Sequence, residues 1–182
     1  MELSKEISNK IISLEKYFNV DIQVQSKNVI ATYFVYEKLT ENLISLLELF
    51  IESNLKFNKQ TTIYVFTNHL DLKVNRENRR VKFLYFPYID KYIMTNRVIF
   101  NYYAIKLFSL YETVFLFDTD LIPIKSFEEV FTKNYDVGLT ISNDWFKNNK
   151  FPINAGFLIC NNSNNKKINN FRDEYLYSYN KT

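Results

Sequence analysis

At its centre the chain reads Phe115-Leu116-Phe117-Asp118-Thr119-Asp120, and this stretch decides the fold class. Together with Thr113 and Val114, the first three of these residues form a strand-like run, 113–117. Asp118 and Asp120 follow this run directly. Continuous runs of this kind are typical of strands that are buried on both faces of a parallel sheet. We therefore predict a buried strand that delivers Asp118 and Asp120 to one edge of a sheet.

Strand-like runs and helical segments alternate along the rest of the chain. The predicted strands are 29–35, 61–67, 81–86, 113–117, 136–141 and 157–160. The predicted helices are one that Thr40 caps, two longer ones at 95–110 and 164–179, and a short one that Ser126 opens with a capping-box pattern. This alternation indicates an α/β fold with a mostly parallel central sheet flanked by helices. No linker or repeat divides the chain, so we predict one domain over 1–182.

The N-terminal segment 1–20 has the periodicity of an amphipathic helix. Apolar residues recur at helical spacing at Leu3, Ile7, Ile11, Leu14 and Phe18. Such a helix can pack on the domain, form a contact in a homo-oligomer, or lie on a membrane surface. Its polar face mixes Lys and Glu instead of being basic, so we predict that it packs on the domain.

Composition excludes several classes of protein. The chain has 182 residues, of which 47% are hydrophobic, and this is typical of a globular protein. No apolar run is long enough to span a membrane, and the N-terminus lacks the apolar region of a signal peptide. Cys160 is the only cysteine, which fits a reducing compartment, so we expect a cytoplasmic protein.

The charge balance argues against a nucleic-acid partner, because the formal net charge is only +3. One basic cluster, 76–82, holds Arg79 and Arg80. We interpret this cluster as a solvated turn, with a contact to phosphate or to an anionic acceptor as the alternative.

The two aspartates suggest a metal site. Residues i and i+2 point the same way on a strand, so Asp118 and Asp120 could converge on one ion at the strand end. Mg²⁺ and Mn²⁺ favour carboxylate and water ligands and leave positions open for phosphate oxygens. The alternative is two solvated carboxylates in a loop. In open α/β sheets ligands bind beyond the carboxyl ends of strands, which favours a site near Tyr36 and Asp118.

The order of motifs resembles the GT-A glycosyltransferases, particularly the glycogenin-like and related sugar transferases. The first matching segment, 111–124, is a hydrophobic strand, then Asp-x-Asp, then an apolar pair, and a short helix follows. The second is Asn154-Ala155-Gly156, which begins 34 residues after Asp120. The resemblance covers about residues 28–172.

The resemblance implies roles for the donor site. Asp120 would bind the metal, and Asp118 would bind the metal, the donor ribose or both. The end of the first strand, from Tyr33 to Tyr36, would cradle the base and ribose, with Tyr36 stacking on the base; core packing is the alternative. The family carries a donor-contacting cation on the helix before the motif, for which we choose Lys106, with Arg97 as the other option.

The resemblance also implies roles further along the chain. Asn154 would face the donor sugar or the acceptor, and Gly156 would let the backbone approach. Asp144 would orient an acceptor hydroxyl or act as a base, with a place in a surface loop as the alternative, and Trp145 would stack on a sugar ring. Many relatives add a histidine as third metal ligand, but we interpret His69, the only histidine here, as structural.

The sequence therefore predicts a Mn²⁺- or Mg²⁺-dependent glycosyltransferase. It would move a sugar from a UDP- or GDP-sugar to a carbohydrate, protein or lipid-linked acceptor. With no third metal ligand in view, we expect a weak transferase or part of one. The alternatives are a haloacid-dehalogenase-type phosphatase with Asp118 as nucleophile, a sugar-phosphate nucleotidylyltransferase, which the missing glycine-rich loop disfavours, and a non-catalytic remnant that binds sugars or a partner protein.

Overall fold

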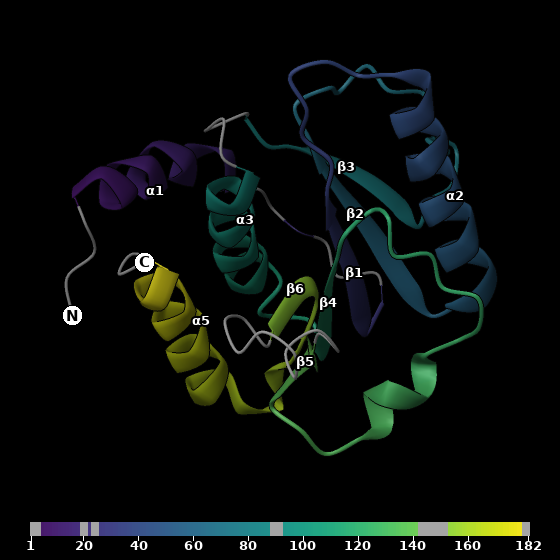
Figure 1. Ribbon diagram of the computed structural model, residues 1–182. Coiled ribbons are helices and arrows are strands. Elements are labelled where there is room, and N and C mark those ends of the chain that lie inside the picture. The colour runs from purple at the N-terminus through teal and green to yellow at the C-terminus, as the bar shows by residue number, and fades with distance from the viewer. Residues whose placement is uncertain (1–4, 19–21, 23–25, 88–92, 142–152, 180–182) are drawn as a thin grey trace, which may run out of the picture.

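The computed structural model describes residues 5–18, 22, 26–87, 93–141 and 153–179 (Figure 1). Its helices are α1 (Lys5–Phe18), α2 (Glu41–Phe57), α3 (Ile93–Leu107) and α5 (Asn165–Tyr179). Its strands are β1 (Asn28–Tyr33), β2 (Thr61–Thr67), β3 (Val81–Tyr85), β4 (Thr113–Phe117), β5 (Val137–Ile141) and β6 (Ile153–Asn161). Two short 3₁₀ turns, η1 (Glu128–Thr132) and η2 (Asn162–Asn164), complete the described elements.

The six strands form one mixed sheet in the order β3-β2-β1-β4-β6-β5. The first four strands in this order, β3, β2, β1 and β4, run parallel to one another, whereas β6 pairs antiparallel with both β4 and β5. The predicted α/β fold with a mostly parallel central sheet is therefore confirmed. Parallel strands require crossover connections: α2 connects β1 to β2, the segment 68–80 connects β2 to β3, and α3 connects β3 to β4.

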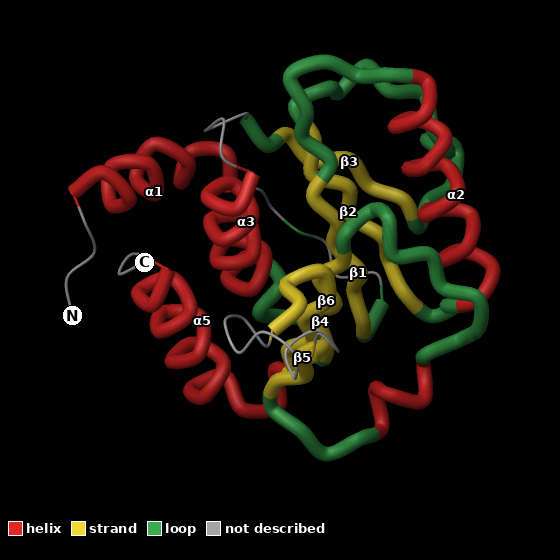
Figure 2. Tube along the Cα trace, viewed as in Figure 1, coloured by secondary structure: helices red, strands yellow, loops and turns green. Residues whose placement is uncertain are grey.

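Helices cover both faces of this sheet, with α2 on one side and α1, α3 and α5 on the other (Figures 1 and 2). Along each central strand, successive side chains alternate between the two layers. On β4, for example, Phe115 and Phe117 belong to the core under α2, while Val114 and Leu116 belong to the core under α3. Burial on both faces explains why the strand sequences are continuously apolar.

The N-terminal helix packs on the domain, as predicted. Ile11 and Leu14 of α1 are buried in the core that α3 and the sheet share. The buried Tyr103 hydroxyl of α3 also donates a hydrogen bond to the backbone carbonyl of Ile11. Leu3, the first residue of the predicted stripe, lies outside the described residues.

Several predicted boundaries differ from the structure. The last strand begins at Ile153 instead of residue 157, and the helix predicted over 95–110 ends at Leu107. Thr40 caps α2 as predicted, because its side chain accepts a hydrogen bond from the Leu43 amide. The capping box at Ser126 is wrong: its hydroxyl accepts from the amide two residues on, Glu128, and the segment that follows is a 3₁₀ turn. In a capping box the Ser126 hydroxyl would accept from the amide three residues on, that of Glu129. The bond to the amide two residues on closes a local turn instead.

None of the helices in the described part of the chain is both long and apolar enough to cross a membrane.

Two arginines of the basic cluster clamp the backbone, which neither sequence interpretation foresaw. The Arg80 guanidinium donates to the carbonyl oxygens of Leu55, Asn58 and Lys59 at 2.8 to 2.9 Å, where α2 ends. The last carbonyls of a helix lack partners within the helix and carry partial negative charge. Arg76 similarly donates to the carbonyls of Leu70 and Leu72.

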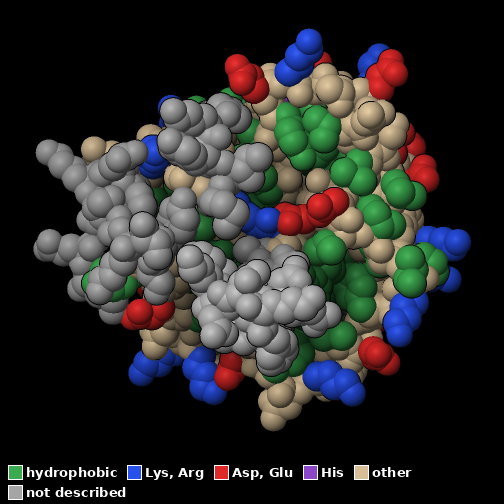
Figure 3. Space-filling model, viewed as in Figure 1, with side chains coloured by type: hydrophobic (Ala, Val, Ile, Leu, Met, Phe, Trp, Pro, Cys, Tyr) green, Lys and Arg blue, Asp and Glu red, His purple; other side chains and the backbone are tan. Residues whose placement is uncertain are grey.

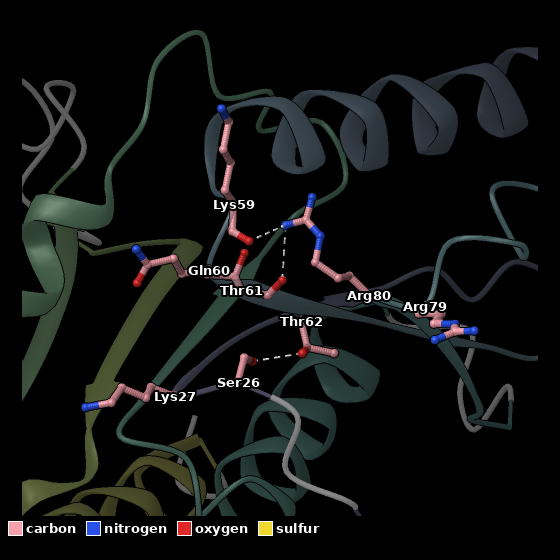
Figure 4. Close-up of a pocket in the computed structure, with 8 residues that line it drawn as sticks. All are labelled: Ser26, Lys27, Lys59, Gln60, Thr61, Thr62, Arg79 and Arg80. Atoms are coloured by element: carbon pink, nitrogen blue, oxygen red, sulfur yellow. Dashed lines mark hydrogen bonds between the residues drawn. The ribbon is translucent and has the colours of Figure 1, made fainter.

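Arg80 and its neighbour Arg79 form a natural comparison, because in Figure 4 the Arg80 guanidinium reaches the Lys59 carbonyl whereas Arg79 points away from it. We expect Arg80→Ala to lower the free energy of unfolding by about 2 kcal/mol, since it removes several charge-assisted hydrogen bonds. Arg79 is exposed, so Arg79→Ala should change it by less than about 0.5 kcal/mol. Urea unfolding followed by circular dichroism measures both values. Equal effects of the two substitutions would contradict the clamp.

The single thiol gives a second test of the fold. Cys160 lies on β6 with 0% exposure, and burial raises the pKa of its thiol to about 12. Only the thiolate reacts with a disulfide reagent. We therefore expect the folded protein to resist a colorimetric disulfide reagent at pH 8, and to release one equivalent of chromophore once urea unfolds it. Full reaction of the folded protein within the mixing time would show that β6 is open to solvent.

Candidate functional site

The chain leaves β4 through a tight turn that three hydrogen bonds hold. The buried Thr32 hydroxyl of β1 donates to the carbonyl of Phe117 at 2.9 Å. The amide of Asp118 donates to the carbonyl of Gly156 at 2.9 Å, and the amide of Leu121 donates back to the Asp118 carbonyl at 3.1 Å. The backbone at Asp118 is thus tied to strands on both sides of β4.

Asp118 and Asp120 were expected to converge because they share one face of a strand, and the turn shows that this expectation is wrong. The strand ends at Phe117, so Asp118 and Asp120 do not share a strand face. The hydrogen bond that closes the turn folds residues 118–121 back, and both aspartates still line one cavity. Convergence therefore comes from turn geometry and not from the strand pleat.

Asp118 forms a two-point ion pair with Arg97. Arg97 Nη1 lies 2.6 Å from Asp118 Oδ2, and Nη2 lies 2.5 Å from Oδ1. The Arg97 side chain is 14% exposed and that of Asp118 is 31% exposed. A bidentate pair with this burial is stronger than an exposed one, because water screens it less.

Opposing effects act on the pKa of Asp118. Burial raises it, the hydrogen bonds and charge of Arg97 lower it, and the neighbouring charge of Asp120 raises it. The direction of the balance is upward, because burial has the largest effect. A cation that binds here would favour the ionised carboxylate over the protonated one.

The aspartates open into a cavity of about 220 Å³ at the carboxyl edge of the parallel strands. Its lining combines charged, aromatic and aliphatic groups: Tyr33, Val35, Tyr36, Leu46, Arg97, Asp118, Thr119 and Asp120. The space-filling view shows basic and acidic side chains meeting near the centre of one face, beside hydrophobic side chains (Figure 3). A pocket with apolar walls and a few converging charged groups is typical of a ligand site.

Polar side chains that follow β2 hold the loop after β1 in place. The Asn68 side chain accepts from the Tyr36 amide at 3.2 Å and donates to the Tyr36 carbonyl at 2.9 Å. His69 Nε2 lies 2.8 Å from the same carbonyl oxygen and donates to it. This contact gives His69 a structural role and presents Tyr36 at the cavity.

Tyr33 and Tyr36 both line the cavity, but their rings differ in setting. The Tyr33 ring packs against Phe86 and Phe100, with centroids 5.4 and 5.5 Å away. The Tyr36 ring meets Phe34 edge to face at 5.0 Å. Tyr33 therefore packs against the core, as the alternative interpretation has it, and also lines the cavity; its contact with a base or ribose stays a prediction.

The structure places Lys106 away from the aspartates. Its Nζ lies 3.5 Å from Glu15 Oε1 of α1, at the last turn of α3. Arg97 is nine residues earlier on the same helix, and a rise of 1.5 Å per residue separates the two by about 13 Å along the axis. The cation that reaches Asp118 is thus Arg97, the second option, and Lys106 as the donor-contacting cation is wrong for this geometry.

The predicted residues near the end of the chain are placed by their backbone. Gly156 is buried and its carbonyl accepts from Asp118, so the segment 154–156 runs beside the aspartates. Asn154 pairs with Thr140 of β5, beyond the end of β4. Asp144, like Trp145, lies outside the described residues.

The two carboxylates suit a weakly held hard cation. Within the described residues, no group of three or more His, Cys, Asp or Glu side chains could hold a metal. Two oxygen-bearing side chains beside an open cavity leave the remaining positions for water and phosphate, which is how Mg²⁺ is usually bound. Asp118 and Asp120 therefore fit a metal that arrives with a phosphorylated ligand.

A larger cavity of about 360 Å³ lies at the opposite edge of the sheet (Figure 4). It is basic, but two of its cations are already engaged: Arg80 by backbone carbonyls, and Lys27 by Glu112 at 3.1 Å. This cavity also sits at the amino ends of β1 and β2, whereas ligands of such sheets bind at the carboxyl ends. We therefore assign the functional site to the smaller cavity.

Sequence reasoning missed three residues that shape the site. Thr32 anchors the end of β4, Asn68 orients the loop after β1, and Leu46 of α2 closes one wall. Asn68 carried a usable signal, because a polar residue directly after a buried strand must lie at the same edge as Asp118. Nothing local marked Thr32 or Leu46.

No protein-family model matches the sequence, and no curated protein matches it. The structure does resemble solved glycosyltransferases. The apo structure of the bifunctional glycosyltransferase WbbM aligns with a TM-score of 0.58 and 13% identity, over 86% of this chain and 35% of that one. The crystal structure of the glycosyltransferase GlyE from Streptococcus pneumoniae TIGR4 aligns with a TM-score of 0.51 and 16% identity, over 82% and 38%. The apo form of GlyE gives 0.53 and 18%, over 82% and 37%.

At these identities the likeness concerns the fold. The chain spans little more than a third of the length of each of these structures. Its six-stranded, mostly parallel sheet with flanking helices is a fold that it shares with these solved glycosyltransferases.

Proposed function

We propose that this protein is a metal-dependent glycosyltransferase that uses a nucleotide-diphosphate sugar. One observation carries the proposal: Asp118, Asp120 and Tyr36 line a single cavity at the carboxyl edge of a glycosyltransferase-like sheet. A nucleotide sugar needs a surface for its base, charge compensation for its diphosphate and room for its sugar. The cavity offers an aromatic ring and a pair of carboxylates beside a guanidinium. The backbone of Gly156 on β6 lies next to Asp118.

In this proposal the loop after β1 holds the nucleoside. The Tyr36 ring stacks on the base, and Asn68 and His69 keep its backbone in position. Val35 and Leu46 supply apolar wall, which excludes water and strengthens the electrostatic interactions inside the cavity. Gly156, beside Asp118, brings the segment with Asn154 towards the sugar.

Asp118 and Asp120 would hold Mn²⁺ or Mg²⁺ against the diphosphate. Such an ion neutralises the leaving group when it is bound. In the transfer, the bond between the sugar's anomeric carbon and the phosphate oxygen breaks, and the nucleoside diphosphate leaves with the electron pair. An acceptor hydroxyl forms the new bond and loses its proton to a base, for which Asp144 remains our prediction.

The phosphatase alternative finds less support in the comparisons. Both oxygens of Asp118 are engaged by Arg97, so a nucleophilic Asp118 would need the guanidinium to move away, as a metal-binding Asp118 would. The solved structures that share the fold are glycosyltransferases, and this favours sugar transfer. The alternative stays testable, because hydrolysis of p-nitrophenyl phosphate that disappears in Asp118→Asn would favour it over sugar transfer.

Ligand-induced melting tests the proposed function. We expect UDP or GDP together with Mn²⁺ to raise the melting temperature, since a ligand at a hundredfold excess over Kd stabilises the folded state by about 2.7 kcal/mol. Nucleotide without Mn²⁺ should give a smaller shift. Asp120→Asn should abolish the Mn²⁺-dependent part, because an isosteric amide keeps the shape and loses the charge. Differential scanning fluorimetry measures all of these shifts.

Asp136→Asn provides the matched control. Asp136 lies just before β5 at the opposite edge of the sheet and pairs with Lys167 at 2.7 Å. This variant should retain the full Mn²⁺-dependent shift. If Asp120→Asn binds nucleotide and Mn²⁺ as well as the unaltered protein does, Asp120 is not a metal ligand and this assignment fails.

A further inference from the structure

The two aspartates of the cavity are unequal. Both carboxylate oxygens of Asp118 are engaged by Arg97, at 2.6 and 2.5 Å. Asp120 is exposed, and it makes no ion pair or side-chain hydrogen bond with the described residues. One carboxylate is therefore neutralised by a protein cation, and the other is open to solvent.

This inequality sets a condition on metal binding. Among the described residues that line the cavity, one guanidinium against two carboxylates gives a formal charge of −1. A divalent cation that approaches Asp118 meets the positive guanidinium at the same oxygens and must displace it or share them. Because the pair is largely shielded from water, this repulsion is only weakly screened. Arg97 and the metal therefore compete for one ligand.

The donor's diphosphate changes this balance. The planar fork of a guanidinium matches phosphate oxygens as well as it matches a carboxylate. A diphosphate in the cavity would offer Arg97 a second anion and free the oxygens of Asp118 for the ion. Two ligands that each remove an obstacle to the other bind cooperatively, and the effect is reciprocal.

We propose that Arg97 is a positioning residue that makes metal binding depend on the nucleotide: it holds Asp118 until a diphosphate takes over the guanidinium. The proposal rests on the proposed function, because it assumes that Asp118 is a metal ligand and that the anion is a nucleoside diphosphate. It adds an order of events, in which the ion binds weakly by itself and tightly together with the nucleotide.

The same helix supplies a matched control for Arg97. Lys106 of α3 carries the same charge but pairs with Glu15 of α1, with its side chain 50% exposed. Arg97→Gln and Lys106→Gln remove one positive charge each, so they change the net charge of the protein equally. Only the first removes the competitor of the metal at Asp118.

The experiment measures Mn²⁺ affinity by the electron paramagnetic resonance signal of free Mn²⁺, with and without UDP or GDP. For Mn²⁺ alone, we expect Arg97→Gln to bind about tenfold more tightly than the unaltered protein, within the usual range of coupling between sites. Lys106→Gln should bind as the unaltered protein does. In the unaltered protein nucleotide should tighten Mn²⁺ binding, and in Arg97→Gln this gain should shrink.

The Asp118→Asn background separates competition at this residue from a general charge effect. In that background, Arg97→Gln should no longer raise the affinity for Mn²⁺. If Arg97→Gln does not fold, Arg97→Lys takes its place, since it keeps the charge but loses the fork and should give part of the gain.

Unchanged or weaker binding of Mn²⁺ alone in the Arg97 variants would overturn the proposal, as would an equal gain in Lys106→Gln. The proposed function fails in a different way. If neither UDP nor GDP tightens Mn²⁺ binding in the unaltered protein, the donor assignment is wrong, while competition between Arg97 and Mn²⁺ is still read from the metal alone.

Discussion

The burial of β4 on both faces is the constraint on which the rest of the structure depends. Its five residues are all buried, with Phe115 and Phe117 in the core under α2 and Val114 and Leu116 in the core under α3. A strand in this position needs neighbours on both sides to satisfy its backbone, and β1 and β6 provide them. Since the strand is held so firmly, the turn that follows it is held as well. The hydrogen bonds from Thr32 and to Gly156 then place Asp118 with little freedom.

The two edges of the sheet use charge for different purposes. At the amino edge, Arg80 satisfies carbonyl oxygens that the end of α2 leaves without partners, so its charge stabilises the backbone. At the carboxyl edge, Arg97 faces the side chain of Asp118, which a ligand can reach because the pair lines a cavity. A bond to a main-chain carbonyl is a fixed part of the fold, whereas an ion pair in a cavity can be exchanged for another. This difference is why the smaller cavity is the better site for chemistry.

Much of the fold could be predicted from local sequence, because the strands are short apolar runs with clear ends. β2 and β4 begin and end at the predicted residues, and Thr40 caps its helix as expected. The predictions were weaker wherever an element's boundary depended on a contact with another segment or on the geometry of a turn. Ser126 has the residues of a capping box but closes a different turn, and β6 starts four residues before its apolar run. Pairing with β5 extends β6 over 153–156, and this pairing has no local signal.

The sequence by itself determined the α/β class, the place of Asp118 and Asp120 after a buried strand, and the place of Tyr36 near the same edge of the sheet, since each follows from the order of residues along the chain. The tertiary structure alone decided which cation meets Asp118. Arg97 and Lys106 lie on one helix and carry the same charge, but the helix turns one towards the cavity and the other towards α1. It also decided that the aspartates converge through a turn and that Thr32 and Asn68 support them. These facts depend on contacts between segments far apart in the chain, and such contacts are set by the packing of the whole sheet and its helices.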